Sequence, residues 1–371
     1  MQYRPFGNTG WKASRLGFGA MRLPMLSGKK VEGPEVDVRK SVRVMHRAFD
    51  LGVNMVDTLC FYHEGMSEPT VGKGVKGRRH KVWIQTKCQA YKELAKGETL
   101  ADRFLVALKA LNVEYVDAYL MHSLGLGTFQ KVGERFVDEM QPFLRDGRIR
   151  FLGFSSHDSP ANIATFIKSG MFQVMLVQYN LIERDKGRVI RLAHRAGMGT
   201  SAMGPVGGGR LAGQPEHLDE HFAQEGYGSP EIALNFVFAN EGLDVAFSGM
   251  NTIEMVDENA RIASRRQKLS SQECSRLTAT FRRKARKAKL FCTGCRYCMP
   301  CPSGVAIPNN LDLLSNAQLY GAWEYARQEY MGLETEKKAS NCKKCGKCLK
   351  KCPQKIAVIE YLEEVARVFE P

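Results

Sequence analysis

Apolar and polar positions alternate in blocks along roughly the first 260 residues. Short apolar runs end in polar loops, and longer stretches with apolar residues at helical spacing follow them, such as DVRKSVRVMHRAFDLG and TLADRFLVALKALN. The runs expected to be strands are residues 16–20, 54–57, 82–86, 116–121, 149–154, 174–177, 199–203 and 245–247. Eight strands, each followed by a helix, predict an α/β fold with a closed (β/α)8 TIM barrel.

An open, doubly wound sheet is the alternative architecture for the same alternation of strands and helices. Such a sheet usually has a Gly-x-Gly-x-x-Gly turn after its first strand, where a dinucleotide binds. The corresponding segment here, GFGAMR at 17–22, lacks the third glycine. The barrel is therefore favoured.

Eight of the eleven cysteines lie in two runs near the C-terminal end of the chain. Zinc ribbons pair two C-x2-C knuckles, whereas each run here starts C-x2-C-x2-C and ends in Cys-Pro, like the ferredoxin run C-x2-C-x2-C-x3-C-P. The second run has that spacing throughout, and the first is one residue short before its last cysteine. Two four-iron clusters are predicted, with zinc as the alternative.

In the ferredoxin pattern the fourth cysteine of each run ligates the other cluster. One cluster would then use Cys292, Cys295, Cys298 and Cys352, and the other Cys342, Cys345, Cys348 and Cys301. The helical sequence between the runs excludes a compact ferredoxin, and the segment resembles the helical dicluster ferredoxin domain. The predicted organisation is a barrel over 1–262, a basic helical linker over 263–290 and a helical dicluster 4Fe-4S ferredoxin-like domain over 291–371. The scattered Cys60, Cys88 and Cys274 are expected to be inert thiols.

The composition adds a basic character, with 54 Lys and Arg against 39 Asp and Glu and a net charge of +15. Part of the excess is the run FRRKARKAK at 281–289, which would suit a solvated helix surface or an acidic electron-transfer protein, a ferredoxin or flavodoxin. The sequence has no nucleic-acid-binding motif beside this basic run and no apolar run long enough to span a membrane. The start MQYRPFGNTG resembles no secretory signal, so a cytoplasmic location is expected. The sequence does not indicate the oligomeric state.

Four ionisable residues stand where three consecutive predicted strands end: Asp57, Tyr62, Lys87 and His122. Barrel enzymes place catalytic groups at this end of the strands. Each residue has a structural explanation by itself, but together they suit carbonyl reduction, which needs a hydride at carbon and a proton at oxygen. A phenol beside an ammonium group is a better proton donor, a carboxylate would hold that ammonium, and an imidazole would orient the carbonyl.

These segments carry a resemblance to a known family. RPFGNTGWKASRLGFGAMRLP, NMVDTLCFY, IQTK and YLMHS look like the opening and catalytic segments of aldo-keto reductases, in the bacterial branch with a C-terminal ferredoxin domain. The resemblance implies NADPH or NADH as hydride donor and an aldehyde, ketone or alcohol as the small-molecule substrate. It maps the family's catalytic tetrad onto Asp57, Tyr62, Lys87 and His122.

The nicotinamide cofactor would be held mainly by loops at the ends of the strands. MGPVGGGRL (203–211) and SGMNTIEMVDEN (248–259) supply glycines and polar groups for phosphates. The resemblance implies that FSS (154–156) and Gln178 flank the nicotinamide, and that Glu258 and Asn259 flank the adenine. The expected contacts are Gly19, Ala20, Met21, Ser155, Ser156, Gln178, Met203, Pro205, Val206, Gly207, Gly209, Arg210, Gly249, Asn251, Glu258 and Asn259. Met203 and Met255 replace a tyrosine and an arginine common in the family, so either nicotinamide fits.

The predicted function is thus an NAD(P)H-dependent oxidoreductase of carbonyl or alcohol groups, with two clusters for electron transfer, redox sensing or structural support. The alternative is a ferredoxin-type electron carrier or interaction protein in which the barrel is a scaffold. Nicotinamide moves electrons in pairs and iron–sulfur clusters move them singly, and no flavin signature accompanies them.

Overall fold

The computed structural model describes residues 1–26, 33–265, 269–287, 290, 292 and 296–370. The chain divides into two compact units. The first comprises Met1–Pro205 and Ala233–Ser270, and the second comprises Val206–Ile232 and Ser271–Pro371. The second unit therefore combines an insertion from the middle of the chain with the C-terminal stretch.

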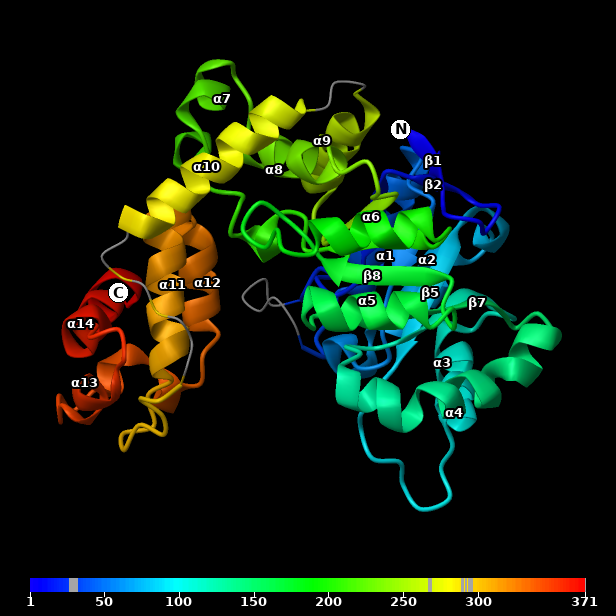
Figure 1. Cartoon of the computed structure of the whole chain (residues 1–371), viewed down its shortest axis with the longest axis horizontal. Helices are drawn as coiled ribbons and strands as arrows, with labels where there is room; N and C mark the ends of the chain where they lie inside the picture. The colour runs from blue at the N-terminus through cyan, green and yellow to red at the C-terminus, as the bar shows by residue number, and fades with distance from the viewer. Residues whose placement is uncertain (27–32, 266–268, 288–289, 291, 293–295, 371) are drawn as a thin grey trace. The chain divides into compact units, whose positions relative to one another are not determined.

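The first unit is a closed barrel of eight parallel strands (Figure 1). The strands are β3 (Leu16–Gly19), β4 (Met55–Asp57), β5 (Trp83–Cys88), β6 (Val116–Met121), β7 (Ile149–Ser156), β8 (Val174–Gln178), β9 (Gly199–Met203) and β10 (Val245–Ser248). Each strand pairs with the next in sequence, and β10 pairs with β3 to close the barrel. The predicted fold and all eight predicted strands are confirmed.

Helices cover the outside of the strands, as a parallel sheet buried on both faces requires. Every residue of β5 and of β6 is buried. The helices of the barrel are α1 (Val38–Asp50), α2 (Ser67–Val75), α3 (Leu100–Leu111), α4 (Leu126–Arg145), α5 (Pro160–Lys168), α6 (Gly187–Arg195), α9 (Ile253–Ser264) and the later part of α8 (Ser229–Phe238).

A hairpin of β1 (Tyr3–Pro5) and β2 (Lys12–Ser14) precedes the barrel. Phe6, which follows β1, meets Trp83 edge-on at 5.2 Å between ring centroids. Trp83 begins β5 and stacks on Phe151 at 5.6 Å. These rings fill the end of the barrel where its strands begin, which leaves the polar residues at the strands' carboxyl ends as the candidate site.

The second unit is helical. Its C-terminal stretch contains α10 (Ser271–Lys287), α11 (Ile307–Tyr320), α12 (Trp323–Met331), α13 (Lys347–Lys351) and α14 (Val358–Phe369). Helices α11 and α12 are the helical sequence expected between the cysteine runs, and they lie side by side (Figure 1). Leu314, Tyr330, Val365 and Phe369, all nearly inaccessible to solvent, belong to the core that these helices form.

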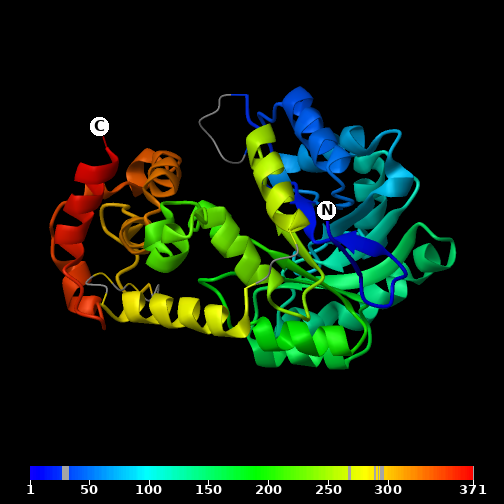
Figure 2. The ribbon, with the colours of Figure 1, turned by 90° about the horizontal axis from the view of Figure 1, so that it is seen from above.

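The insertion 206–232 packs against the C-terminal stretch within this unit (Figure 2). It contains the 3-10 helices η3 (Gly207–Gly209) and η4 (Pro215–His217) and the short helix α7 (Glu220–Gln224). Lys284 Nζ of α10 donates to the carbonyl of His217 at 2.5 Å, and the Arg276 guanidinium lies 4.7 Å from the Phe222 ring centroid. The sequence analysis includes this insertion in the predicted barrel, over 1–262. The sequence does not reveal its packing against the C-terminal stretch, because contacts between distant segments leave no local signal.

Among the described residues, none of the helices has the length and apolarity that crossing a membrane requires.

Candidate active site and cysteine-lined cavity

A buried ion pair lies at the centre of the carboxyl end of the barrel. Lys87, next to last in β5, is 1% exposed, and its Nζ donates to Asp57 Oδ2 at 2.7 Å and to the Thr58 carbonyl at 2.8 Å. Burial lowers the pKa of Lys87, and the nearby Asp57 carboxylate opposes that effect. Because an unpaired charge is costly in such a place, Asp57 is what allows a lysine to be buried here.

Gln85 is a member of this site that the sequence analysis missed. Its Nε2 donates to the other Asp57 oxygen at 2.8 Å, so both carboxylate oxygens are bonded and the carboxylate is fixed in orientation. The available signal was its position two residues before Lys87, because alternate residues of a strand face the same side.

Tyr62 follows β4 and is 8% exposed. Lys87 Nζ lies 5.1 Å from the centroid of its ring, which places the ammonium charge beside the phenol. The next two residues, His63 and Glu64, have φ of 54° and 53°, in the left-handed region that residues other than glycine rarely adopt. His63 Nε2 accepts the backbone N–H of Leu23 at 3.1 Å, which fastens this unusual turn to the loop after β3.

His122 follows β6, and its ring lies among aromatic side chains. The Phe61 ring centroid is 5.4 Å away, and Tyr91 Oη is 3.5 Å from His122 Nδ1. Burial, with the Lys87 charge as the next cause, lowers the pKa of His122 to about 3. The imidazole is therefore neutral around pH 7 and can orient a carbonyl group without adding a charge. Tyr91 is a second residue that the sequence analysis missed.

Glu68 is a buried carboxyl group on the helix side of β5. It stands in the first turn of α2, is 1% exposed, and accepts a hydrogen bond from Thr86 Oγ1 at 2.5 Å. Burial raises its pKa to about 7, although the Thr86 hydroxyl and the Lys87 charge both favour the ionised form. The acid thus titrates near neutral pH beside the strand that carries Lys87.

The expected cofactor contacts in the first unit occupy strand ends and the loops that follow them. Ser155 and Ser156 end β7 and are buried, and Gln178 ends β8. Gln178 Nε2 donates to Glu183 Oε2 at 2.8 Å, which fixes the amide at this strand end. Other expected contacts in this unit are Gly19, Ala20, Met21, Met203, Pro205, Gly249, Asn251, Glu258 and Asn259.

One of these residues leaves a buried polar atom without a partner. Asn251 Oδ1 has no hydrogen-bond donor among the described residues, in the loop between β10 and α9. Asn259 of α9 is 6% exposed and donates from Nδ2 to Ser248 Oγ at 3.2 Å. An unpaired acceptor in this loop fits a ligand hydroxyl or amine group, such as those of a ribose or an adenine, rather than a phosphate.

The remaining expected contacts, Val206, Gly207, Gly209 and Arg210, belong to the insertion in the second unit. Gly207, Gly208 and Gly209 have φ of 60°, 67° and 106°, so the turn needs glycines. Arg210 Nε donates to the Gly207 carbonyl at 2.9 Å. A Cβ on Gly209 would lie 3.1 Å from the Tyr325 ring, so α12 closely supports this turn.

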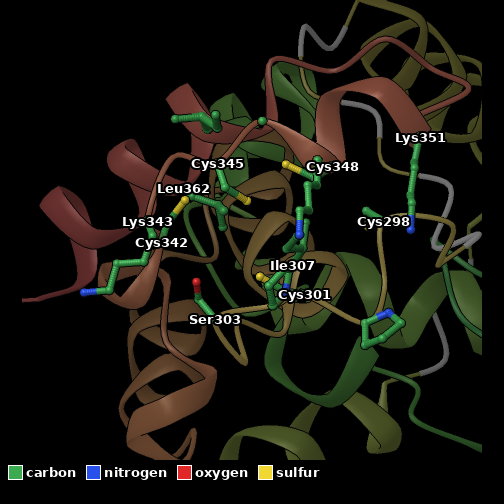
Figure 3. A pocket seen from close by; sticks show the side chains of 15 residues that line it. Cys298, Cys301, Ser303, Ile307, Cys342, Lys343, Cys345, Cys348, Lys351 and Leu362 are labelled. Carbon is green, nitrogen blue, oxygen red and sulfur yellow. The ribbon is translucent and has the colours of Figure 1, made fainter.

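A cavity in the second unit brings cysteines of the two runs together. Cys301 of the first run lines it with Cys342, Cys345 and Cys348 of the second, and Figure 3 shows these four around one space. Cys298 lines the same cavity further from the others (Figure 3). Among the described residues no three His, Cys, Asp or Glu side chains converge closely enough to hold a single metal ion. The donor set, four thiols around a shared space, is the one that a four-iron cluster uses.

The other predicted cluster ligands are less completely described. Cys292, Cys298 and Cys352 are half-buried against the core of the second unit, and Cys292 lines a second, more open hollow. Cys295 lies outside the described residues. Burial raises the pKa of the thiols of the scattered cysteines, to about 11 for Cys60 and Cys274 and about 12 for Cys88, so these thiols stay protonated at neutral pH.

The aldo/keto reductase family profile matches residues 15–281, well over half of the chain. The chain belongs to the aldo/keto reductase family. A 4Fe-4S dicluster domain matches residues 291–357, so this aldo/keto reductase carries a C-terminal iron–sulfur domain. Both parts of the predicted resemblance are confirmed.

Individual relatives of this aldo/keto reductase are distant. An L-galactose dehydrogenase of Arabidopsis thaliana is 26% identical over 285 residues, which cover 70% of this chain and 87% of that protein. An NADH-specific methylglyoxal reductase of Escherichia coli is 24% identical over 232 residues, which cover 57% of this chain and 70% of that protein. The holo form of an aldo-keto reductase from Bacillus halodurans matches 75% of this chain and 96% of its own, with a TM-score of 0.63 and 23% identity, and shows the same fold.

Two methionines stand at expected cofactor positions of this aldo/keto reductase. Met203 ends β9 and packs against the apolar cluster inside the barrel. Met255 lies in the first turn of α9 and is 45% exposed. Neither side chain carries a charge that could pair with the extra phosphate of NADPH.

Proposed function

We propose that the barrel is an NAD(P)H-dependent reductase of aldehydes or ketones or, in the reverse direction, an NAD(P)+-dependent dehydrogenase of the corresponding alcohols. The observation that supports it most is the buried Lys87–Asp57 pair beside Tyr62, with the neutral His122 just after the next strand. When bound, the reduced nicotinamide would supply the hydride that the carbonyl carbon receives.

The residues of the chain would manage the proton and the position of the carbonyl group. Tyr62 is the proposed general acid for the carbonyl oxygen. The Lys87 ammonium would favour the phenolate that remains, and Asp57 would keep that ammonium charged and in place. A neutral His122 can donate one N–H to the carbonyl oxygen and fix its direction. The names of two relatives, L-galactose dehydrogenase and methylglyoxal reductase, suggest a small polar substrate.

Tyr62→Phe tests the proposed acid. The ring remains, so nicotinamide affinity should change little, while the turnover number for aldehyde reduction should fall at least about a hundredfold. Tyr115→Phe, which removes a hydroxyl just before β6 at the opposite end of the barrel, is the matched control and should retain activity. Oxidation of NADPH and NADH would be followed with a panel of aldehydes. A Tyr62→Phe protein within a few-fold of wild type would refute the assignment.

For the second unit, we propose two four-iron clusters bound by the eight cysteines of the two runs. Cys301 would complete the site of Cys342, Cys345 and Cys348, which the shared cavity supports. Cys352 would complete that of Cys292, Cys295 and Cys298. Anaerobic purification should then yield about eight iron and eight sulfide per chain. About four of each would mean that only one site is a cluster.

A further inference from the structure

The cysteine-lined cavity has a basic rim on the surface of the second unit. Lys343, Lys347 and Lys351 line the cavity itself, and all three are exposed. They recur every fourth residue, and Lys347 and Lys351 share a face of α13. Figure 3 shows Lys343 and Lys351 on opposite sides of the cysteines. Among the described residues that line the cavity there is no carboxylate.

Further lysines near the rim add to its positive charge. Lys350 and Lys355 in the same segment are exposed, and no Asp or Glu occurs from Cys342 to Lys355. Lys344 is excluded from the count, because its Nζ forms an ion pair with Glu363 of α14. Leu349, within α13, is 41% exposed and gives the charged surface an apolar contact point.

The solvent exposure of the cysteine thiols also indicates that a partner would approach at this rim. Of the described cysteines, Cys345 alone is exposed, and the others are half-buried or buried. Cys345 belongs to the four that surround the cavity. A redox centre held there would reach the surface at this thiol, inside the basic rim, where a partner could approach closely.

The basic run of α10 is a weaker candidate for the same role. Lys284 is committed to the insertion, because its Nζ donates to the carbonyls of His217 and Glu216. Arg282 and Arg283 are exposed but lie on α10, and neither lines the cavity. The charge that surrounds the proposed cluster is therefore that of Lys343, Lys347 and Lys351.

We propose that this rim, with Leu349, is the docking surface for a small acidic protein that carries single electrons, such as a ferredoxin. The proposal rests on the proposed binding of a cluster by Cys301, Cys342, Cys345 and Cys348. Complementary charge would steer the partner onto the rim and orient its redox centre toward Cys345. Each encounter transfers one electron: the partner is oxidised by one electron, the cluster is reduced by one, and no bond or proton is involved.

Two double variants with the same change in net charge test the location. Lys347→Glu with Lys351→Glu reverses the rim, and Arg282→Glu with Arg283→Glu reverses two exposed charges of α10. The probe is an acidic plant-type [2Fe-2S] ferredoxin, whose affinity for the immobilised holoprotein is measured by surface plasmon resonance. At about 50 mM salt the rim variant should bind at least about tenfold more weakly than wild type, and the α10 variant should stay within about twofold.

Salt and iron content separate the explanations. Raising salt to about 300 mM should weaken wild-type binding strongly and the rim variant's binding less. Iron and sulfide should be equal in all three proteins, and if the rim variant loses them, Lys347→Gln with Lys351→Gln replaces it. Photoreduced deazaflavin, which needs no docking, should reduce each protein equally.

Several results would overturn the docking surface. They are equal weakening by the α10 variant, wild-type affinity in a rim variant that retains its iron, and binding that does not respond to salt. A rim-dependent affinity for duplex DNA, with ferredoxin binding unchanged, would assign the surface to nucleic acid instead. A wild-type protein without iron and sulfide would refute the proposed clusters themselves, before any partner is added.

Discussion

The sharpest quantitative expectation concerns Glu68, the buried acid behind β5. Its pKa is raised to about 7 in the folded protein from an ordinary value of 4.5, mainly by burial. In Glu68→Gln the side chain keeps its shape, and its amide oxygen can still accept the Thr86 hydroxyl. The variant therefore removes an ionisation that is costly in this place and little else.

The sign and size of the effect follow from the two pKa values. An acid whose pKa is higher in the folded state favours folding below its unfolded pKa, and that advantage is lost as pH rises through the folded pKa. A difference of about 2.5 in pKa, at about 1.4 kcal/mol for each pKa unit, corresponds to about 3.5 kcal/mol in total. Between about pH 5 and pH 8, wild type should lose about 2–3 kcal/mol of unfolding free energy relative to Glu68→Gln.

Urea unfolding of the barrel followed by tryptophan fluorescence can measure this difference. The chain has three tryptophans, and a Trp323→Phe background leaves only Trp11 and Trp83, both in the first unit. Glu134→Gln changes an exposed carboxylate of α4 and is the matched control, with a difference from wild type that should not depend on pH. A difference between wild type and Glu68→Gln that stays constant from about pH 5 to pH 8 would refute the reasoning.

Further expectations concern catalysis and the clusters. Lys87→Met should lower the turnover number at least about a hundredfold, and residual activity with the wild-type pH profile would contradict its coupling to the proton donor. Because burial lowers the pKa of Lys87, the rate of wild-type carbonyl reduction should begin to fall, as pH rises, before pH 10.5, lysine's ordinary pKa. A fall that begins only above pH 10.5 would contradict this expectation. His122, with a pKa of about 3, should cause no inflection in the rate between about pH 5 and pH 8, and an inflection that His122→Gln removes would show it charged. Cys301→Ala and Cys352→Ala should each reduce iron content by about half, whereas Cys274→Ala should leave it unchanged; full iron in either would refute that ligand.

The barrel and its central residues could be predicted because their signals are local. A buried parallel strand is an apolar run, and a polar residue at its end stands out, as Lys87 does after VWIQT. Glu68 could not be recognised in the same way, because its burial depends on the packing of α2 against β5. The place of the insertion was also beyond the sequence, since Lys284 and His217 are 67 residues apart. The cysteine spacing indicated the type of ligand, but only the fold shows Cys345 at the surface.

The discontinuous second unit has a consequence for how the protein is made. During synthesis the insertion leaves the ribosome after residues 1–205 of the first unit, before the last segment of that unit, 233–270, and long before α10, α11 and α12. Leu211, Leu218 and Phe222 are completely buried in the finished protein. Until the C-terminal stretch is made, these side chains lack the helices of that stretch as packing partners. The middle of the reductase is thus completed only when the last part of the chain has emerged and folded. If the proposed clusters stabilise the C-terminal stretch, a shortage of iron and sulfide would also leave the insertion, in the middle of the chain, without its packing partners.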